Sequence, residues 1–223
     1  LDTPATEPVA DAYVQNGNYF DTNFGTTAAL NIQNSTDAGS ASNSYLKFNV
    51  GNMANVGTAI LKLTPFQVEG NTTINCELVS DDSWTEHSLN WNNQPTGTSN
   101  LFATISDFTM GVPVSINITD LVAAEAAADG IISIRLSAQN SNSPLVSFVS
   151  SENTVLEAHP VIEYLLTEEP ATPEGVSATA TSSSQIVLNW NQTANAIRYN
   201  ISRAGNSGGP YSIIARNTSG TSY

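Results

Sequence analysis

The feature that most constrains the fold of this chain is a series of short segments in which apolar and polar residues alternate. The segments recur roughly every 8–12 residues, with Gly, Asn, Pro and Ser between them. Alternation with a period of two places apolar side chains on one face of a strand, and many short strands are typical of sandwiches and barrels. We therefore expect an all-β protein. The clearest candidate strands are 45–50, 58–66, 74–79, 113–118, 131–138, 146–150 and 161–166.

One stretch, residues 119–129, is predicted to be a helix instead. It reads Thr-Asp-Leu-Val-Ala-Ala-Glu-Ala-Ala-Ala-Asp. We expect Thr119 to cap its N-terminus, Asp120 to face the positive end of the helix dipole, and Gly130 to end it.

The character of the sequence changes at residues 168–174, where prolines stand among small and acidic residues, a composition typical of a stiff linker. The alternating segments that follow, 185–190 and 197–203, resemble the first strands of a fibronectin type III domain, with Trp190 in the core. That resemblance implies a domain that stops about where its fifth strand should begin. The expected parts are a β-sandwich over 8–167, a linker over 168–174, and a partial fibronectin type III (immunoglobulin-like) sandwich over 175–223.

The charge of the chain is strongly negative and unevenly distributed. Residues 1–167 hold 17 acids against three bases and so carry the whole net charge of −14. An acidic surface of this kind repels phosphate backbones and anionic membranes, which argues against nucleic-acid binding. No stretch is long and apolar enough to insert into a membrane. A polar surface dominated by Asn, Ser and Thr suits a secreted or cell-surface protein.

The single cysteine, Cys76, has no partner within the chain for a disulfide. It lies in an alternating segment, so we expect it to be buried as a small hydrophobic residue and not to act as a nucleophile.

Residues 81–95 form the most distinctive stretch, because two tryptophans, three acids and a run of Asn and Gln fall in one polar, hairpin-like segment. Taken with residues 10–14 and 44–48, it resembles the DNRLRE-type carbohydrate-binding modules, in which the pattern D-W-x-E…W-N-x-x-P recurs. The resemblance covers nearly all of residues 8–167. It implies a jelly-roll-like antiparallel β-sandwich, in a secreted multidomain protein, that binds a polysaccharide.

The acids of this segment have three interpretations. Paired carboxylates are what a glycosidase needs, but turn formation and capping of backbone amides explain Asp81, Asp82 and Glu86 better, and in the resembled family the segment is structural. Carboxylate and amide oxygens also suit a hard cation, and related jelly-roll modules often carry a structural calcium ion. The candidate metal ligands are Asp11, Asp21, Asp81 and Asp82, among which spacing selects no set.

Aromatic residues are candidates for stacking on sugar rings. Trp84 is expected in the core, whereas Trp91 fits a core or an exposed position equally. In the loop 16–25, the triplet 23–25 matches the Asn-aromatic-Gly pattern of the resembled family and is expected to fix the loop, leaving Tyr19 to face solvent. A loop satisfied by its own Asx turns is the alternative.

Alternation places the three bases of the first domain, Lys47, Lys62 and Arg135, on outward strand faces. If their strands share a sheet, they gather on one concave surface beside Tyr45 and Glu152. Members of the resembled family that bind alginate use basic residues at similar positions. With so few bases, a neutral or sparsely charged glycan fits equally well. Alternatively, Lys47 and Arg135 pair with acids such as Glu152 across the sheet.

The resulting hypothesis is a non-catalytic polysaccharide-binding module of a protein whose catalytic domain lies elsewhere in the parent chain. The alternatives are a structural or adhesive module of a surface protein without a sugar ligand, and a hydrolase or lyase, which needs a cleft with a paired acid and base. The candidate ligand-binding residues are Tyr19, Tyr45, Lys47, Lys62, Trp91, Arg135 and Glu152.

Overall fold

The computed structural model describes residues 3–35, 41–53, 55–95, 99–167, 170–193, 196 and 198–223. Its elements are nearly all strands, so the predicted all-β class is confirmed. The chain forms two compact units that divide between residues 165 and 166. Residues 168 and 169 of the predicted linker lie outside the described residues.

The first unit contains two sheets, and the strand pairs whose register is described are antiparallel. The smaller sheet has the strand order β1 (Ala5–Thr6), β12 (Val161–Leu166), β5 (Val56–Leu63) and β9 (Val114–Asn117). The larger has the order β6 (Pro65–Val68), β11 (Ser143–Val149), β3 (Ala29–Asn34), β4 (Ser42–Asn49), β10 (Ile131–Ala138), β7 (Ile74–Val79) and β8 (Ser99–Ile105), while β2 (Ala10–Gln15) also pairs with β4. The pairing of β1 with β12 extends the unit N-terminal of residue 8.

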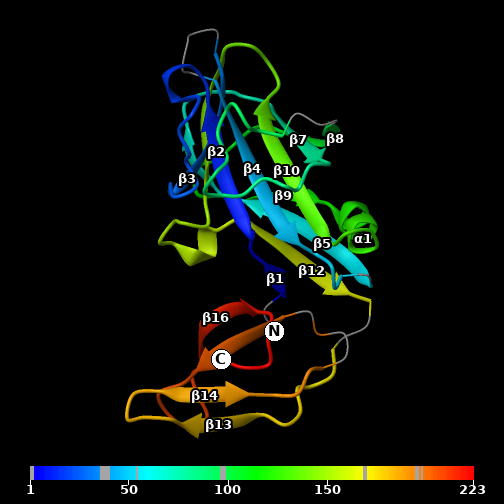
Figure 1. The fold of residues 1–223 in the computed structure, drawn as a ribbon, viewed down its shortest axis with the longest axis vertical. Coiled ribbons are helices and arrows are strands. Elements are labelled where there is room, and N and C mark those ends of the chain that lie inside the picture. Colours follow the sequence, from blue (N-terminus) through cyan, green and yellow to red (C-terminus); the bar gives the residue numbers. More distant parts are fainter. Residues whose placement is uncertain are drawn as a thin grey trace. The chain divides into compact units, whose positions relative to one another are not determined.

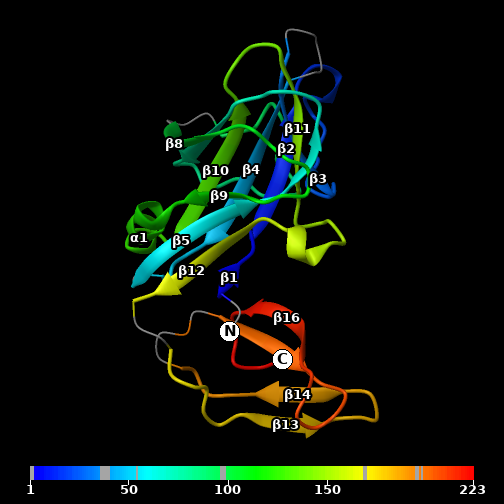
Figure 2. The ribbon, with the colours of Figure 1, turned by 180° about the vertical axis from the view of Figure 1, so that it is seen from behind.

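The two sheets stack face to face, because β5 and β12 lie behind β4 and β10 in Figure 1 and in front of them in Figure 2. Alternate residues of the central strands fill the space between them. Leu46 and Phe48 of β4 and Leu61 and Leu63 of β5 are completely buried, as the alternation predicts. Cys76 of β7 is also buried and free, as expected.

The opposite face of the larger sheet is covered too, by the segment between β7 and β8. Trp84 and Leu89 of this segment form a second apolar layer with Tyr45 of β4. The indole Nε1 of Trp84 donates to Ser133 Oγ of β10 at 3.1 Å, and the Trp84 ring meets the ring of Tyr45 edge-on at 6.0 Å. Trp84 is therefore buried, as predicted, but in this second layer and not between the two sheets.

The one α-helix of the described residues, α1 (Thr119–Ala126), contacts β5 and β10 and buries Val122. Thr119 does not cap it: the hydroxyl accepts a hydrogen bond from the backbone N–H of Ala59 at 2.9 Å. The helix ends at Ala126, three residues earlier than the predicted 119–129. Gly130, which was expected to end it, follows the intervening turn with φ of +80°, and a Cβ there would lie 2.5 Å from Cα of Gly51. None of the helices in this part of the chain is long and apolar enough to cross a membrane. The shorter 3-10 turns are η1 (Gly17–Tyr19) and η2 (Leu156–Ala158).

The second unit consists of two antiparallel pairs, β13 (Ser177–Ala180) with β14 (Ile186–Asn189), and β15 (Tyr199–Arg203) with β16 (Ser212–Thr218). Trp190 is buried, as predicted, and packs edge-on against Tyr199 at 5.1 Å. The last residues return beside β14, where the backbone groups of Leu188 and Tyr223 exchange hydrogen bonds of 2.8 and 2.9 Å.

Candidate functional site

The loop 16–25 is fastened to the segment 81–95 by the side chain of Asn23. Its Nδ2 donates to the backbone carbonyls of Glu86 at 2.6 Å and Leu89 at 2.8 Å, while its Oδ1 accepts from the N–H of Gly25 at 3.2 Å. Glycine is required at position 25, because a Cβ there would lie 2.2 Å from the carbonyl oxygen of Glu86. The predicted role of residues 23–25 in fixing the loop thus has a structural basis.

Aromatic side chains surround this junction. Phe24 stacks on Tyr13 with ring centroids 4.2 Å apart, and Trp91 packs partly buried against the Trp84 layer. Tyr19 is 47% exposed and its neighbour Phe20 45%. The loop therefore presents an aromatic surface to solvent at Tyr19, as predicted, whereas most of Trp91 serves packing.

Lys47 of β4 lies beneath the segment 81–95 and binds it. Its Nζ donates to the backbone carbonyls of Asp82, at 2.8 Å, and Trp84, and lies 4.4 Å from the centroid of the Trp84 ring. Burial lowers the pKa of Lys47, against the opposing effect of the nearby carboxylates of Asp82 and Asp81. An ammonium group has three N–H donors, so one remains for a further acceptor.

A shallow cleft of about 360 Å³ opens above Lys47. Its sides mix apolar surface with groups that donate and accept hydrogen bonds, and the side chain of His87 on its wall is 74% exposed. The lining residues are Val9, Ala10, Lys47, Trp84, Thr85, Glu86 and His87. This arrangement suits a polar ligand that also has apolar faces.

The prediction that the three bases share one concave surface is wrong. Lys62 lies on β5, in the smaller sheet, and its Nζ forms a 2.7 Å ion pair with Glu163 of β12. Arg135 of β10 forms a bidentate pair with Glu77 of β7, at 2.8 and 3.0 Å. Arg135 therefore forms an ion pair across the sheet, which was the alternative interpretation of its outward position, but its partner is Glu77 and not Glu152.

Tyr45 is not an exposed ligand-binding residue. Alternation places it correctly on the face opposite Leu46, but the segment 81–95 covers that face and leaves Tyr45 with no exposed surface. Its hydroxyl donates to Gln94 Oε1 at 3.0 Å. Burial raises the pKa of Tyr45 to about 12, partly offset by the charge of Arg135.

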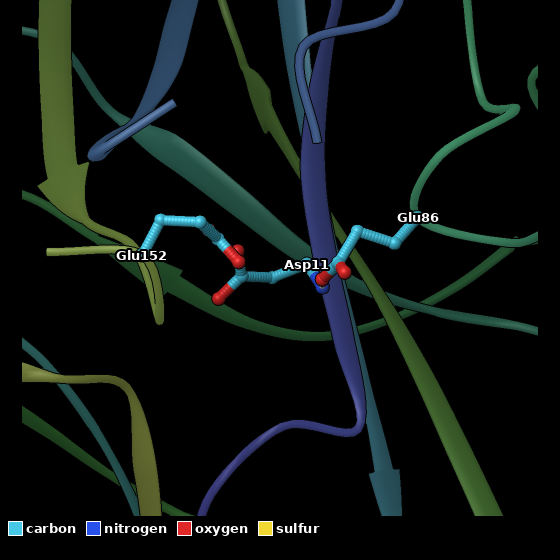
Figure 3. Close-up of side chains that lie close together, drawn as sticks. All are labelled: Asp11, Glu86 and Glu152. Atoms are coloured by element: carbon cyan, nitrogen blue, oxygen red, sulfur yellow. The ribbon is translucent and has the colours of Figure 1, made fainter. Parts of the chain in front are cut away.

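Three carboxylates from distant parts of the sequence meet beside the cleft, as Figure 3 shows. Asp11 comes from β2, Glu86 from the segment 81–95, and Glu152 from the turn after β11. One oxygen from each lies within 4.8 Å of the other two. Asp11 lies between the two glutamates and is completely buried, and its Oδ1 has no hydrogen-bond partner.

Backbone and hydroxyl groups orient these carboxylates. The N–H of Ser151 donates to Asp11 Oδ2 at 2.9 Å, and Ser151 Oγ donates to Glu152 Oε1 at 3.1 Å. The backbone N–H of Asp11 itself donates to Glu86 Oε1 at 2.9 Å. The described pairing of β2 is with β4 alone, so Glu86 satisfies an N–H on the open edge of β2.

The cluster carries an electrostatic cost. Two like unit charges at this separation repel by roughly 3–4 kcal/mol at an effective dielectric constant near 20. Burial raises the pKa of Asp11 well above its usual range, and the negative charge of Glu152 raises it further. Among the three carboxylates, Asp11 is thus the one whose negative charge is disfavoured by its surroundings.

Among the predicted metal ligands, the structure brings only Asp11 into this cluster. Asp21 accepts a hydrogen bond from Asn92 Nδ2. Asp81 caps the turn that follows it, accepting from the backbone N–H and the hydroxyl of Ser83 at 2.9 and 2.6 Å. Asp82 lies beside Lys47. The four predicted aspartates thus form no common site.

Comparison with known protein families identifies the class of this chain. Residues 3–164 match carbohydrate-binding module family 96, and the chain belongs to that family. No curated protein matches the sequence. Among solved structures, the glycoside hydrolase domain of Endo-D from Streptococcus pneumoniae R6 aligns at 9% identity and a TM-score of 0.36, over 96% of this chain and 31% of that chain. The chain therefore spans about a third of that structure, and so loose an alignment supports no argument about function.

Proposed function

We propose that the first unit binds a polysaccharide without acting on it, and that the cleft above Lys47 holds the glycan. The observation that carries this proposal is the family match, which spans residues 3–164 and thus nearly the whole sandwich. Within that unit the cleft combines a partly buried ammonium group, a tryptophan wall and an exposed imidazole.

Each of these groups suits a sugar. The third N–H of Lys47 is available to a hydroxyl or a carboxylate oxygen, and His87 extends a second polar contact from the wall. Val9 and Ala10 offer apolar surface to the C–H face of a pyranose ring. The exposed ring of Tyr19 provides a stacking surface on the loop that Asn23 fastens to the same segment.

The ligand is expected to be neutral or sparsely charged. All three bases of the first unit already have partners: Arg135 with Glu77, Lys62 with Glu163, and Lys47 with backbone carbonyls. Residues 1–167 carry a net charge of −14. A dense polyanion such as alginate would therefore meet repulsion with little compensating attraction.

The geometry of the carboxylates favours binding over catalysis. A glycosidase places its two carboxyl groups on either side of the scissile bond. Here Asp11 occupies the space between Glu86 and Glu152, with no exposed surface of its own. A sugar cannot enter between the two glutamates while Asp11 holds that place.

The surrounding protein context is also part of the proposal. We assign the module to the DNRLRE type, with a catalytic domain elsewhere in a secreted or cell-surface parent chain, and the second unit to a fibronectin type III spacer. Support for the spacer comes from its paired strands, its buried Trp190 and the return of the chain beside β14. Such a module would raise the effective concentration of an attached enzyme at its substrate.

Matched lysine variants test the site. Lys47→Met removes the ammonium group of the cleft, whereas Lys62→Met removes the ammonium group of another partly exposed lysine, which lies on the other sheet. We expect Lys47→Met to raise the dissociation constant for the bound glycan about 10- to 100-fold, the range for losing a charge-assisted hydrogen bond. Lys62→Met should leave affinity unchanged. Isothermal titration calorimetry measures both, with thermal unfolding as the check on folding.

His87→Ala keeps the test decisive if Lys47→Met fails to fold, because the His87 side chain is mostly exposed. It should weaken binding roughly three- to tenfold. Unchanged binding in both variants, with a loss in Tyr19→Ala, would move the site to the loop 16–25. Failure of the wild-type chain to bind any glycan would favour the structural or adhesive role.

A further inference from the structure

We propose that Asp11, Glu86 and Glu152 bind a calcium ion, which ties β2, the segment 81–95 and the turn after β11 to one another. This site is separate from the contacts proposed for the glycan, apart from Glu86, which borders both.

The spacing of the carboxylates fits such an ion. Calcium–oxygen distances are about 2.3–2.6 Å, so two ligands on opposite sides of one ion lie roughly 5 Å apart. The three candidate oxygens lie within 4.8 Å of one another, which is within the span of a single calcium ion.

Asp11 gives an independent indication of a missing partner. It is completely buried, its carboxylate belongs to the cluster, and its Oδ1 has no hydrogen-bond partner. Unpaired buried carboxylate oxygens are costly, and proteins normally satisfy them with a donor or a metal ion.

The carboxylates are also held in place before any ion arrives. The N–H groups of Ser151 and Asp11 and the hydroxyl of Ser151 each bond one carboxylate oxygen. Donors of this kind orient the ligands at established metal sites. An ion can reach the cluster from solvent past Glu86, because the Glu86 side chain is 21% exposed.

The donor chemistry favours calcium among common metal ions. The cluster contains oxygen ligands only, whereas zinc sites in proteins usually include His or Cys. Magnesium requires nearly ideal octahedral geometry, while calcium accepts six to eight oxygens in irregular arrangements completed by water and carbonyl groups. Three carboxylates supply enough negative charge to attract a divalent cation from solution.

The test uses the complete 223-residue chain, stripped with a chelator and then titrated with calcium chloride. Calorimetric titration should show saturable binding near one ion per chain. At free calcium 100-fold above the dissociation constant, the midpoint of thermal unfolding of the first unit should rise by roughly 5–10 °C.

Two amide variants separate a bound ion from a general charge effect. Glu152→Gln should abolish the calcium-dependent rise, while the metal-free midpoint stays unchanged or increases because one repulsive charge is gone. Asp81→Asn is the control. Asp81 lies in the segment 81–95, as Glu86 does, but its carboxylate accepts hydrogen bonds from Ser83 in its own turn. This variant should keep the full calcium-dependent rise of the unfolding midpoint.

Three results would overturn the proposal: no calcium binding by the wild-type chain, an equal loss of the rise in Asp81→Asn, or stabilisation by magnesium but not by calcium. The first would leave a proton shared within the cluster as the explanation of its geometry. The glycan proposal would survive any of these results, because the paired lysine variants test it separately.

Discussion

The junction between the loop 16–25 and the segment 81–95 depends on Asn23, and replacing this residue by alanine should loosen both. Asn23→Ala removes two donated hydrogen bonds, to the carbonyls of Glu86 and Leu89, and one accepted from Gly25. Because Glu86 belongs to the cleft wall and Leu89 to the buried layer, the loss affects the candidate site and the core together.

The expected magnitude follows from these contacts. A typical intramolecular hydrogen bond contributes about 1 kcal/mol net, and leaving a buried group unsatisfied costs about 1–3 kcal/mol. The junction is partly buried, so water can replace some of the lost contacts. We therefore expect the free energy of unfolding to fall by about 2–4 kcal/mol, which corresponds to a midpoint about 5–15 °C lower for a unit of this size.

Urea and thermal unfolding of the wild type and the variant measure this change, and glycan titration measures its effect on the cleft. Asn18→Ala is the matched control, because Asn18 lies exposed in the same loop and should change the free energy of unfolding by less than about 0.5 kcal/mol. A loss below about 0.5 kcal/mol in Asn23→Ala would show that the junction does not depend on these bonds.

Three further predictions concern titration, reactivity and ion pairs. Burial raises the pKa of Tyr45 to about 12, so the stability that the neutral phenol contributes is fully present below pH 10 and is lost as the pH rises through 12. Between pH 9 and 11, the free energy of unfolding in urea should fall by about 1–1.5 kcal/mol more for the wild type than for Tyr45→Phe. Parallel pH dependence of the two unfolding free energies would contradict this prediction. Cys76 is buried with a pKa of about 12, so alkylation by iodoacetamide at pH 8 should require unfolding, and rapid labelling of the native protein would refute this. Lys62→Met should reduce the free energy of unfolding by less than about 1 kcal/mol because the Lys62–Glu163 pair is about one-third exposed. Arg135→Met should cost about 2–3 kcal/mol, since it removes the cation beside the buried Glu77 carboxylate, which keeps its hydrogen bond from Ser137 Oγ; equal costs in the two variants would contradict the burial argument.

Alternation in the sequence was sufficient to predict which way strand residues point, but not what covers them. It placed Leu46 inward and Lys47 and Tyr45 outward on β4, and the structure agrees. It could not show that the segment 81–95 folds back over the outward face. Tyr45 is buried for that reason, although its direction was predicted correctly.

The pairing of strands within the sheets could not be predicted from the sequence either. Lys47, Lys62 and Arg135 share the same outward pattern, yet β5 belongs to a different sheet from β4 and β10. Alternation within a strand carries no information about which strands are neighbours, because pairing is decided by connections and packing far along the chain. Lys47 and Arg135 therefore lie on neighbouring strands of one sheet, whereas Lys62 lies on the other, and each base has its own partner.

The carboxylate cluster could not be predicted from the sequence for a similar reason, because its residues are far apart in the chain. Asp11 was a predicted metal ligand, but Glu86 was interpreted as a cap and Glu152 as a partner for bases. The contact of Asp11 with Glu86 joins residues 75 apart in sequence, and no local spacing rule spans that distance. The one available signal was chemical: several acids stand near turns in a chain with few bases to neutralise them.

Retardation of the wild-type chain on native gels tests the central claim, polysaccharide binding, most directly. The gels would contain alginate, pectin, xylan, mannan, agarose or laminarin, each with calcium or with EDTA. We predict selective retardation by a neutral or sparsely charged glycan and little by alginate. Migration unchanged by every polysaccharide would contradict the claim that this member of the family binds a glycan.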